Sequence, residues 1–285
     1  MARSRINNLR LQAEAEVLPA DIGIFDSGVG GLSVVRELQH RQFRHGFTYI
    51  ADQAHAPYGE RALDEILQLS LSIADFLVRH GANIIVLACN TASAAALYEL
   101  RNIYPEIHFV GMEPAVKPAA ERTACGKVGV LATSATLAGE PYAGVLRRFA
   151  GDVAVFTQVC PDFVRLVGTG DVSSAHARRA VAKNIRPLLN KGVDKLALAC
   201  THYSFLAPLI RQVAGDSIEV IDPAAAVATQ VERITGHLGK STPVESGQPE
   251  PRRQYFTTGR TADFEITAAR LLNSNLHALQ LSWKS

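Results

Sequence analysis

Two cysteines lie at matching positions of an internal repeat, and their chemistry is the most informative feature of the sequence. Residues 77–93 (LVRHGANIIVLACNTAS) align without a gap with residues 188–204 (LLNKGVDKLALACTHYS), which places Cys89 on Cys200. Each copy reads as a helix end, a glycine, an apolar strand, a cysteine and the polar start of another helix. A gap-free match through all of these features favours duplication over chance similarity between α/β units.

Two thiols on opposite sides of one small ligand could exchange protons at a single carbon. Racemisation needs one group to remove a proton from one face and another group to return a proton to the opposite face. A free cysteine has a pKa of about 8.5, and the amides at a helix N-terminus favour its thiolate. We therefore predict that Cys89 and Cys200 act as opposed acid/base groups.

Short polar residues follow both cysteines, at the starts of predicted helices where a carboxylate can bind. They are Asn90 and Thr91 after Cys89, and Thr201 and His202 after Cys200. His202 could polarise Cys200 or relay a proton to it, and Asp26 with Ser27 could do the corresponding work near Cys89. Taken singly, Asp26 would more often be a turn or N-cap residue, and His202 a hydrogen-bonded core residue.

The other cysteines and a glycine-rich turn allow further interpretations. Cys125 and Cys160 lack this context and are interpreted as inert, and the cysteine spacing predicts neither a metal site nor disulfides. Residues 28–31 (GVGG) partly match a dinucleotide-binding fingerprint, but Ser33 occupies the third glycine position. We interpret these glycines as allowing backbone amides to approach a small carboxylate, with a nicotinamide-dependent oxidoreductase as an alternative.

The elements expected around these residues alternate between strands and helices. Apolar strand-like runs occur at residues 22–25, 47–51, 83–88, 128–131 and 195–199, and helical patterns at 63–80 and 175–191. Short strands buried on both faces and separated by helices are typical of α/β proteins with mainly parallel sheets. Ligands bind beyond the carboxyl ends of such strands, and both cysteines are expected there.

The repeat predicts two similar domains related by a pseudo-twofold axis. We expect residues 1–21 to be a flexible N-terminal tail, residues 22–112 with 223–285 to form the first domain, and residues 113–222 to form the second. The last segment is expected to return to the first domain because the FTTG run and its helix follow the second repeat. The active site would then lie in the cleft between the domains.

The composition excludes several classes of protein. The chain has 285 residues, of which 47% are hydrophobic and 20% are charged, with a formal net charge of +2. This balance is that of a globular protein, and the scattered Lys and Arg residues predict no nucleic-acid or membrane partner. Neither an export signal nor a membrane span is recognisable, which favours a cytoplasmic protein with reduced thiols.

From about residue 22 to the FTTG segment at 256–259, the sequence resembles the glutamate racemases. The matching motifs are FDSGVGGLSV at 25–34, PYGER at 57–61, ACNTAS at 88–93 and CTHY at 200–203. The resemblance implies two flavodoxin-like halves and a homodimer that works without pyridoxal phosphate or metal. It also implies a role in supplying D-glutamate for bacterial cell-wall peptidoglycan.

The resemblance further implies roles for individual residues. Cys89 and Cys200 would be the catalytic pair, with Asp26 and His202 as their supporting polar groups. The substrate-contacting pairs of the family match Asp26 and Ser27, Tyr58 and Gly59, Asn90 and Thr91, and Thr201 and His202. Thr133 and Thr136 match carboxylate-binding positions.

Three segments depart from the family pattern. Ala199 and Ser204 flank the second thiol motif where the family often has Gly and Pro, and residues 222–224 read Asp-Pro-Ala where Asp-Ser-Gly is common. Gly168 replaces a commonly acidic residue, which puts a proton relay through that position in doubt. Two alternatives therefore stay open: a racemase of aspartate or a hydantoin, and a binding protein that has lost catalysis.

Overall fold

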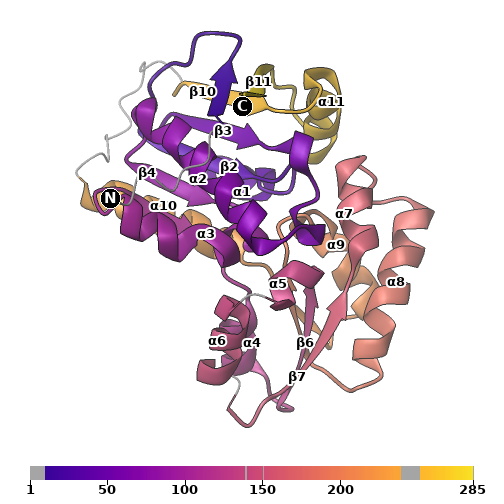
Figure 1. Cartoon of the computed structure of the whole chain (residues 1–285). Helices are drawn as coiled ribbons and strands as arrows, with labels where there is room; N and C mark the ends of the chain where they lie inside the picture. Colours follow the sequence, from indigo (N-terminus) through magenta and orange to yellow (C-terminus); the bar gives the residue numbers. More distant parts are fainter. Residues whose placement is uncertain (1–9, 139, 150, 239–250, 285) are drawn as a thin grey trace.

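The computed structural model describes residues 10–138, 140–149, 151–238 and 251–284, which form two α/β halves (Figure 1). The first half is built on a seven-stranded sheet of order β1-β11-β10-β3-β2-β4-β5, and the second half on a four-stranded sheet of order β7-β6-β8-β9. Every strand pair is parallel except β1 with β11. This confirms the predicted α/β class with mainly parallel sheets.

The strands of the first sheet are β1 (Arg10–Ala13), β2 (Ile22–Asp26), β3 (Phe47–Ala51), β4 (Ile84–Leu87), β5 (His108–Gly111), β10 (Arg253–Thr257) and β11 (Ala278–Lys284). The helices of this half are α1 (Leu32–His40), α2 (Leu63–Arg79), α3 (Asn90–Ile103), α10 (Ala224–His237) and α11 (Thr261–Leu272), with the short 3-10 helices η2 (Gln53–His55) and η3 (Tyr58–Glu60).

The strands of the second sheet are β6 (Lys127–Ala132), β7 (Ala154–Val159), β8 (Lys195–Ala199) and β9 (Glu219–Ile221). The helices of this half are α4 (Val116–Arg122), α5 (Ser134–Ala138), α6 (Glu140–Phe149), α7 (Pro161–Gly168), α8 (Ala175–Leu189) and α9 (Tyr203–Ala214). None of the helices within the described ranges is both long and apolar enough to cross a membrane.

The internal repeat of the sequence reappears in the order of the strands. The run β3-β2-β4-β5 in the first sheet has the same relative order as β7-β6-β8-β9 in the second. Cys89 follows β4 and Cys200 follows β8, so each cysteine comes after the corresponding strand of its own sheet. Because all of these strands are parallel, both cysteines lie at carboxyl ends.

Packing inside the two halves is repeated as well. A Cβ atom on Gly23 of β2 would lie 2.7 Å from Leu77 at the end of α2, and one on Gly129 of β6 would lie 3.0 Å from Leu188 at the end of α8. Leu77 and Leu188 are the first residues of the two aligned segments. A glycine in the neighbouring strand therefore lets the helix that precedes β4 or β8 pack closely in both copies.

The N-terminal segment differs from the expected tail. Residues 10–13 form β1, which pairs antiparallel with β11, and the Leu11 side chain is buried in the same apolar cluster as Leu281. The prediction of a flexible tail as far as residue 21 is wrong for this stretch, and residues 1–9 lie outside the described part of the chain. The physical reason is that β11 would otherwise present an unpaired edge.

The chain passes from the first sheet to the second after β5 and returns after β9, and α11 and β11 (yellow in Figure 1) lie against the N-terminal part of the first half. On this basis we keep as a proposal the division into residues 22–112 with 223–285 and residues 113–222.

Candidate active site

A cavity of about 600 Å³ lies between the two halves, and both Cys89 and Cys200 line it. The first half contributes Ser27, Pro57, Tyr58, Gly59, Glu60, Cys89, Asn90 and Thr91. The second half contributes Thr133, Ser134, Val159, Pro161, Val164, Arg165, Cys200, Thr201 and His202. The two thiols therefore reach one cavity from separate sheets, which is the arrangement that the repeat predicts.

Cys89 is the N-cap residue of α3 and is buried. Its Sγ atom accepts a hydrogen bond from the Ala92 amide at 3.4 Å and lies 4.0 Å from Ser27 Oγ. Burial, and then the charge of Asp26, raise the pKa of the thiol to about 12, and these hydrogen bonds offset only part of the rise.

Cys200 is buried in the same way at the end of β8, and its Sγ atom lies 3.9 Å from His202 Nδ1. Burial and then the nearby Cys89 raise the pKa of this thiol well above its ordinary value, while the amides of His202 and Tyr203 act in the opposite direction. Burial also lowers the pKa of His202, which keeps its imidazole neutral.

The resting thiols differ from the sequence-based expectation. The helix N-termini do supply amides to the sulfur atoms, as expected from the strand-to-helix turns. The loss of water around each sulfur outweighs this effect, because a thiolate is poorly stabilised in a low-dielectric interior. Both cysteines therefore rest as protonated thiols.

Asp26 lies behind the residues that line the cavity. Its carboxylate is fully buried, where Oδ2 accepts a hydrogen bond from the Gly28 amide at 2.9 Å and Oδ1 accepts one from Thr201 Oγ1 at 3.2 Å. Asp26 therefore orients the residue that follows Cys200, and its charge acts on both thiols. From the sequence, Asp26 was expected to assist proton transfer only at Cys89.

The glycine-rich turn packs against the second half of the molecule. A Cβ atom on Gly30 would lie 2.5 Å from Thr201 Oγ1 and 2.7 Å from His202 Cε1, and the Gly28 carbonyl accepts a hydrogen bond from Tyr49 OH at 2.8 Å. None of residues 28–31 lines the cavity, so the approach of their amides to a ligand carboxylate stays a prediction. The structure shows a packing role for Gly30. Its missing side chain makes room for Thr201 and His202.

Hydroxyl groups join the two halves along the cavity. Thr91 Oγ1 lies 3.3 Å from Thr133 Oγ1 and 3.4 Å from Thr136 Oγ1, and the latter two oxygens are 2.9 Å apart. A Cβ atom on Gly59 would lie 2.9 Å from Thr133 Cβ, so the loop of Gly59 also packs closely on the second half. These contacts bring together predicted residues from three separate segments.

Asn90 has the most unusual environment among the residues that line the cavity. Its side chain is 3% exposed, and neither its Nδ2 nor its Oδ1 atom has a hydrogen-bond partner within the described part of the chain. An unpaired buried amide costs about 1–3 kcal/mol. A ligand with both a donor and an acceptor group would relieve this cost.

Several lining residues were not predicted, namely Pro57, Glu60, Ser134, Val159, Pro161, Val164 and Arg165. Val159 is the last residue of β7, which is next to β6 in the second sheet, and Pro161, Val164 and Arg165 follow it. These residues could have been predicted from the carboxyl end of β7, since all parallel strands of one sheet end at the same edge.

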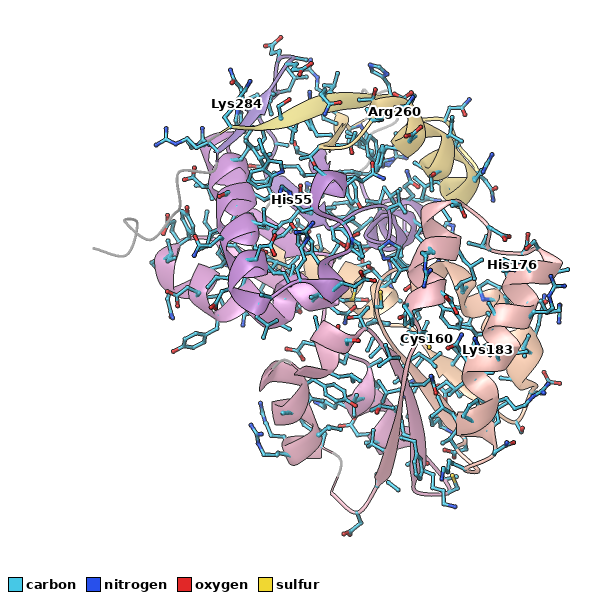
Figure 2. All side chains as sticks on the ribbon, turned by 45° about the vertical axis from the view of Figure 1, so that its right-hand side comes forward. His55, Cys160, His176, Lys183, Arg260 and Lys284 are labelled. Atoms are coloured by element: carbon cyan, nitrogen blue, oxygen red, sulfur yellow. The ribbon has the colours of Figure 1, made fainter. Side chains whose placement is uncertain are left out.

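The other two cysteines and Gly168 lie outside the set of lining residues. Cys160 is buried, and burial raises the pKa of its thiol to about 12, while Cys125 is exposed beside the Gly192 carbonyl. Figure 2 labels Cys160 in the second half. A Cβ atom on Gly168 would meet no atom within 4 Å, so this position faces open space.

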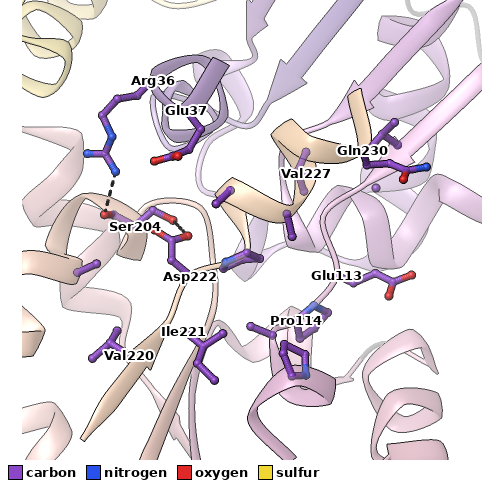
Figure 3. Close-up of a pocket in the computed structure, with 18 of the residues that line it drawn as sticks. Arg36, Glu37, Glu113, Pro114, Ser204, Val220, Ile221, Asp222, Val227 and Gln230 are labelled. Atoms are coloured by element: carbon purple, nitrogen blue, oxygen red, sulfur yellow. Dashed lines mark hydrogen bonds between the residues drawn. The ribbon is translucent and has the colours of Figure 1, made fainter. Parts of the chain in front are cut away.

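A larger cavity of about 1080 Å³ lies where the chain crosses between the halves, and its lining includes neither Cys89 nor Cys200 (Figure 3). Here Ser204 Oγ donates a hydrogen bond to Asp222 Oδ1 at 2.7 Å, and Arg36 donates one to the Ser204 carbonyl at 3.4 Å. Asp222 also accepts the Ala224 amide at 3.0 Å at the start of α10. Ser204, which departs from the resembled family, thus contacts Asp222, the residue before the departing Pro223 and Ala224.

Comparisons with known proteins agree with this geometry. Residues 32–231 match the family model described as Asp/Glu/Hydantoin racemase. The chain is 47% identical to glutamate racemase of Pseudomonas paraeruginosa over 246 residues, which are 86% of this chain and 91% of that protein.

Two solved structures are similar over nearly the whole chain. Glutamate racemase isoform RacE1 from Bacillus anthracis is 30% identical with a TM-score of 0.79, over 91% of this chain and 96% of that one. The Escherichia coli glutamate racemase in complex with L-glutamate and the activator UDP-MurNAc-ala is 28% identical with a TM-score of 0.78, over 94% and 100%. Because the family model matches residues 32–231, which are most of the chain, this protein belongs to the Asp/Glu/hydantoin racemase family.

Proposed function

We propose that this chain is a cofactor-independent glutamate racemase in which Cys89 and Cys200 act as opposed acid and base. The observation that carries the proposal is that two buried thiols, from corresponding strands of two sheets, line one cavity of about 600 Å³. Glutamate as the substrate is supported by the relatives of this chain that bear that name.

The reaction needs one proton removed and one returned. With L-glutamate, the Cys200 thiolate takes the α-proton, and the electron pair of the broken C–H bond moves into the substrate carboxylate. The Cys89 thiol then donates its proton to the opposite face of the α-carbon, which forms D-glutamate. The reverse reaction exchanges the two roles, so that Cys89 is the base for the D-isomer.

The raised thiol pKa values suit this exchange. A thiol that resists ionisation is already protonated to act as the acid, and its thiolate, once formed, is a stronger base than an ordinary one. Neutral His202 lies 3.9 Å from Cys200 Sγ and can accept the thiol proton, and the negative charge of Asp26 favours the imidazolium that results.

The rest of the cavity is suited to a small zwitterion with two carboxylates. The hydroxyls of Ser27, Thr91 and Thr133 can donate hydrogen bonds, and the unpaired Asn90 side chain offers an NH₂ donor group and a carbonyl acceptor. Among the described lining residues, Arg165 is the one Lys or Arg side chain, and it lies on α7 with a largely exposed guanidinium.

Exchange of the α-hydrogen with solvent tests the proposal directly. The purified protein is incubated in D₂O with L-glutamate and separately with D-glutamate, and deuterium at the α-carbon is followed by NMR. Cys89→Ala and Cys200→Ala are expected to abolish racemisation, since either variant removes one of the two proton-transfer groups. Cys160→Ala is the matched control, because it removes a buried thiol outside the cavity, and it is expected to keep its activity.

Three results would contradict the proposal. Unimpaired turnover in both alanine variants would refute the two-thiol mechanism. Faster racemisation of aspartate than of glutamate would assign the substrate differently, and a failure of the natural chain to exchange any α-hydrogen would favour a binding protein that has lost catalysis.

We further propose that the enzyme is a cytoplasmic homodimer whose product, D-glutamate, is used for peptidoglycan. The four unpaired cysteines support a reducing compartment. The homodimer is inferred from the resemblance alone, and sedimentation equilibrium of the purified chain would measure it.

A further inference from the structure

A fully buried carboxylate lies on the far side of Tyr58 from the cavity. Asp52 follows β3, its side chain has no exposed surface, and its amide donates a hydrogen bond to the Asp26 carbonyl at 2.9 Å. Tyr58 OH donates to Asp52 Oδ2 at 2.7 Å. Asp52 therefore lies next to both a residue that lines the cavity and the strand end that carries Asp26.

Three further side chains donate to this carboxylate. Thr258 Oγ1 lies 2.7 Å and Trp283 Nε1 lies 2.8 Å from Asp52 Oδ1, and His55 Nδ1 lies 3.1 Å from both carboxylate oxygens. The four donors come from the loop after β3, the end of β10, and β11. His55, labelled in Figure 2, also packs edge-on against the Trp283 ring, with centroids 5.1 Å apart.

The loop at residues 52–62 carries Pro57, Tyr58, Gly59 and Glu60 to the cavity and has only two single-turn helices of its own. Two further hydrogen bonds join the start of the loop to the residues at the end of β10. Thr258 Oγ1 accepts the Ala54 amide at 3.0 Å, and Thr257 Oγ1 donates to Gln53 Oε1 at 2.8 Å. The position of the loop therefore depends on its attachment to β10 and β11.

We propose that Asp52 is a positioning residue, which holds Tyr58 and Gly59 against the substrate cavity and couples them to Trp283 on the last strand. This inference rests on the proposed function for its kinetic consequence. A carboxylate is required because all four partners present donors, and two carboxylate oxygens can accept all of them. An asparagine would replace one acceptor oxygen by an NH₂ group and leave donors unpaired.

The chain offers a spectroscopic probe at this point, because Trp283 is its single tryptophan. Its indole N–H shares the Asp52 carboxylate with Tyr58 OH, and Tyr58 lines the cavity. Binding of glutamate is therefore expected to change the tryptophan emission in the natural chain. Tyr58→Phe keeps the ring and removes the hydroxyl, so it is expected to abolish this change.

The test compares Asp52→Asn with Glu265→Gln. Glu265 is the matched control, since its carboxylate also anchors β11, accepting the Ala278 amide at 2.8 Å, without contact to the loop. We expect Asp52→Asn to lower kcat/KM for glutamate about 10- to 100-fold. Glu265→Gln is expected to change it less than about twofold, because distant, independent sites do not couple.

A second measurement does not depend on catalysis. Trypsin cleavage after Arg61, which lies at the end of the loop, is followed by mass spectrometry of the folded proteins. Asp52→Asn is expected to accelerate this cleavage at least about fivefold over the natural chain and over Glu265→Gln, because the loop leaves its position more often.

The outcomes separate this inference from the proposed function. If the natural chain does not racemise glutamate but Asp52→Asn still accelerates cleavage at Arg61, the proposed function fails and the role of Asp52 in holding the loop stands. If Asp52→Asn folds with natural near-UV circular dichroism and matches Glu265→Gln in kcat/KM and in cleavage, Asp52 has no positioning role. An unchanged glutamate-dependent emission in Tyr58→Phe would refute the coupling to Trp283.

Discussion

Thr201 Oγ1 of the second half donates a hydrogen bond of 3.2 Å to Asp26 Oδ1 of the first half. This contact joins the residue after Cys200 to Asp26, at the end of β2. The charge of Asp26 also raises the pKa of Cys89. One carboxylate therefore influences both thiols, although it lies behind the cavity surface.

Replacing Asp26 by Asn is expected to make both thiols ionise more easily. The negative charge of Asp26 raises the pKa of Cys89 and of Cys200, so its loss lowers both while burial still keeps them high. The rate of Cys89 alkylation by iodoacetamide at a fixed, mildly alkaline pH should rise. Racemisation should fall on the order of 100-fold, because the imidazolium of His202 and the orientation of Thr201 lose support. Slower alkylation than in the natural chain would contradict the assigned direction.

Gly30→Ala is expected to damage the site where the two halves meet. The new Cβ atom would lie 2.5 Å from Thr201 Oγ1, and so Thr201 and His202 must move. We expect a loss of about 1–3 kcal/mol of unfolding free energy and of about 100-fold in kcat. Gly144→Ala is the control: it lies in α6 with its nearest neighbouring atom at 3.9 Å, and alanine should stabilise that helix slightly. Equal activities of the two variants would show that close packing at Gly30 is unimportant.

Stability should fall in alkaline solution because of the buried thiols. Burial raises the pKa of Cys89 and of Cys160 from 9.0 to about 12, so the unfolded chain loses these protons at lower pH than the folded one. Their contribution is complete below pH 9.0 and is lost as the pH rises toward about 12. In this range each thiol is expected to lower the free energy of unfolding by about 1.4 kcal/mol per pH unit.

Cys160→Ala isolates one of these contributions, because all other titrating groups are common to both proteins. Urea unfolding of the natural chain and the variant at several pH values above 9.0 should show a shallower decline for the variant. Parallel declines would mean that Cys160 ionises as easily in the folded as in the unfolded chain.

Arg165→Ala is expected to raise the KM for glutamate about three- to tenfold with little change in kcat. The Arg165 side chain is 76% exposed at the edge of the cavity and forms an ion pair with Asp162 at 3.1 Å. It therefore attracts the anionic substrate without reaching the reacting atoms. Added salt should reduce the difference between variant and natural chain. Arg178→Ala, which removes an exposed arginine of α8 that bonds Gln212, is the control and should leave KM unchanged. A fall in kcat with constant KM would contradict this role for Arg165.

Much of the fold could be predicted because local patterns determine it. β4 is apolar along its whole length and β8 is apolar after Lys195, and the repeat around Cys89 and Cys200 marks the corresponding strand of each sheet. The strand β1 was missed because its four residues pair only with β11, at the other end of the chain. A pattern within a few residues does not show which distant strand those residues pair with.

The candidate site was predictable where residues follow directly from strand ends. Ser27, Asn90, Thr91, Thr201 and His202 line the cavity together with both cysteines. Arg165 was missed because β7, whose carboxyl end leads into α7, was not among the strands expected from the sequence. Asp52 has no place among the site residues predicted from the sequence, whereas the fold surrounds its carboxylate with four donors.

The sequence by itself determined the doubled α/β plan and the placement of one cysteine at the end of each corresponding strand, because strand periodicity and repeats are local properties. Only the tertiary structure decided that both thiols are protonated, that Asp26 acts on both of them, and that Trp283 reaches Asp52. Ionisation depends on how much water the folded chain excludes, and these contacts join residues far apart in the sequence, so neither exists before the two halves have packed together.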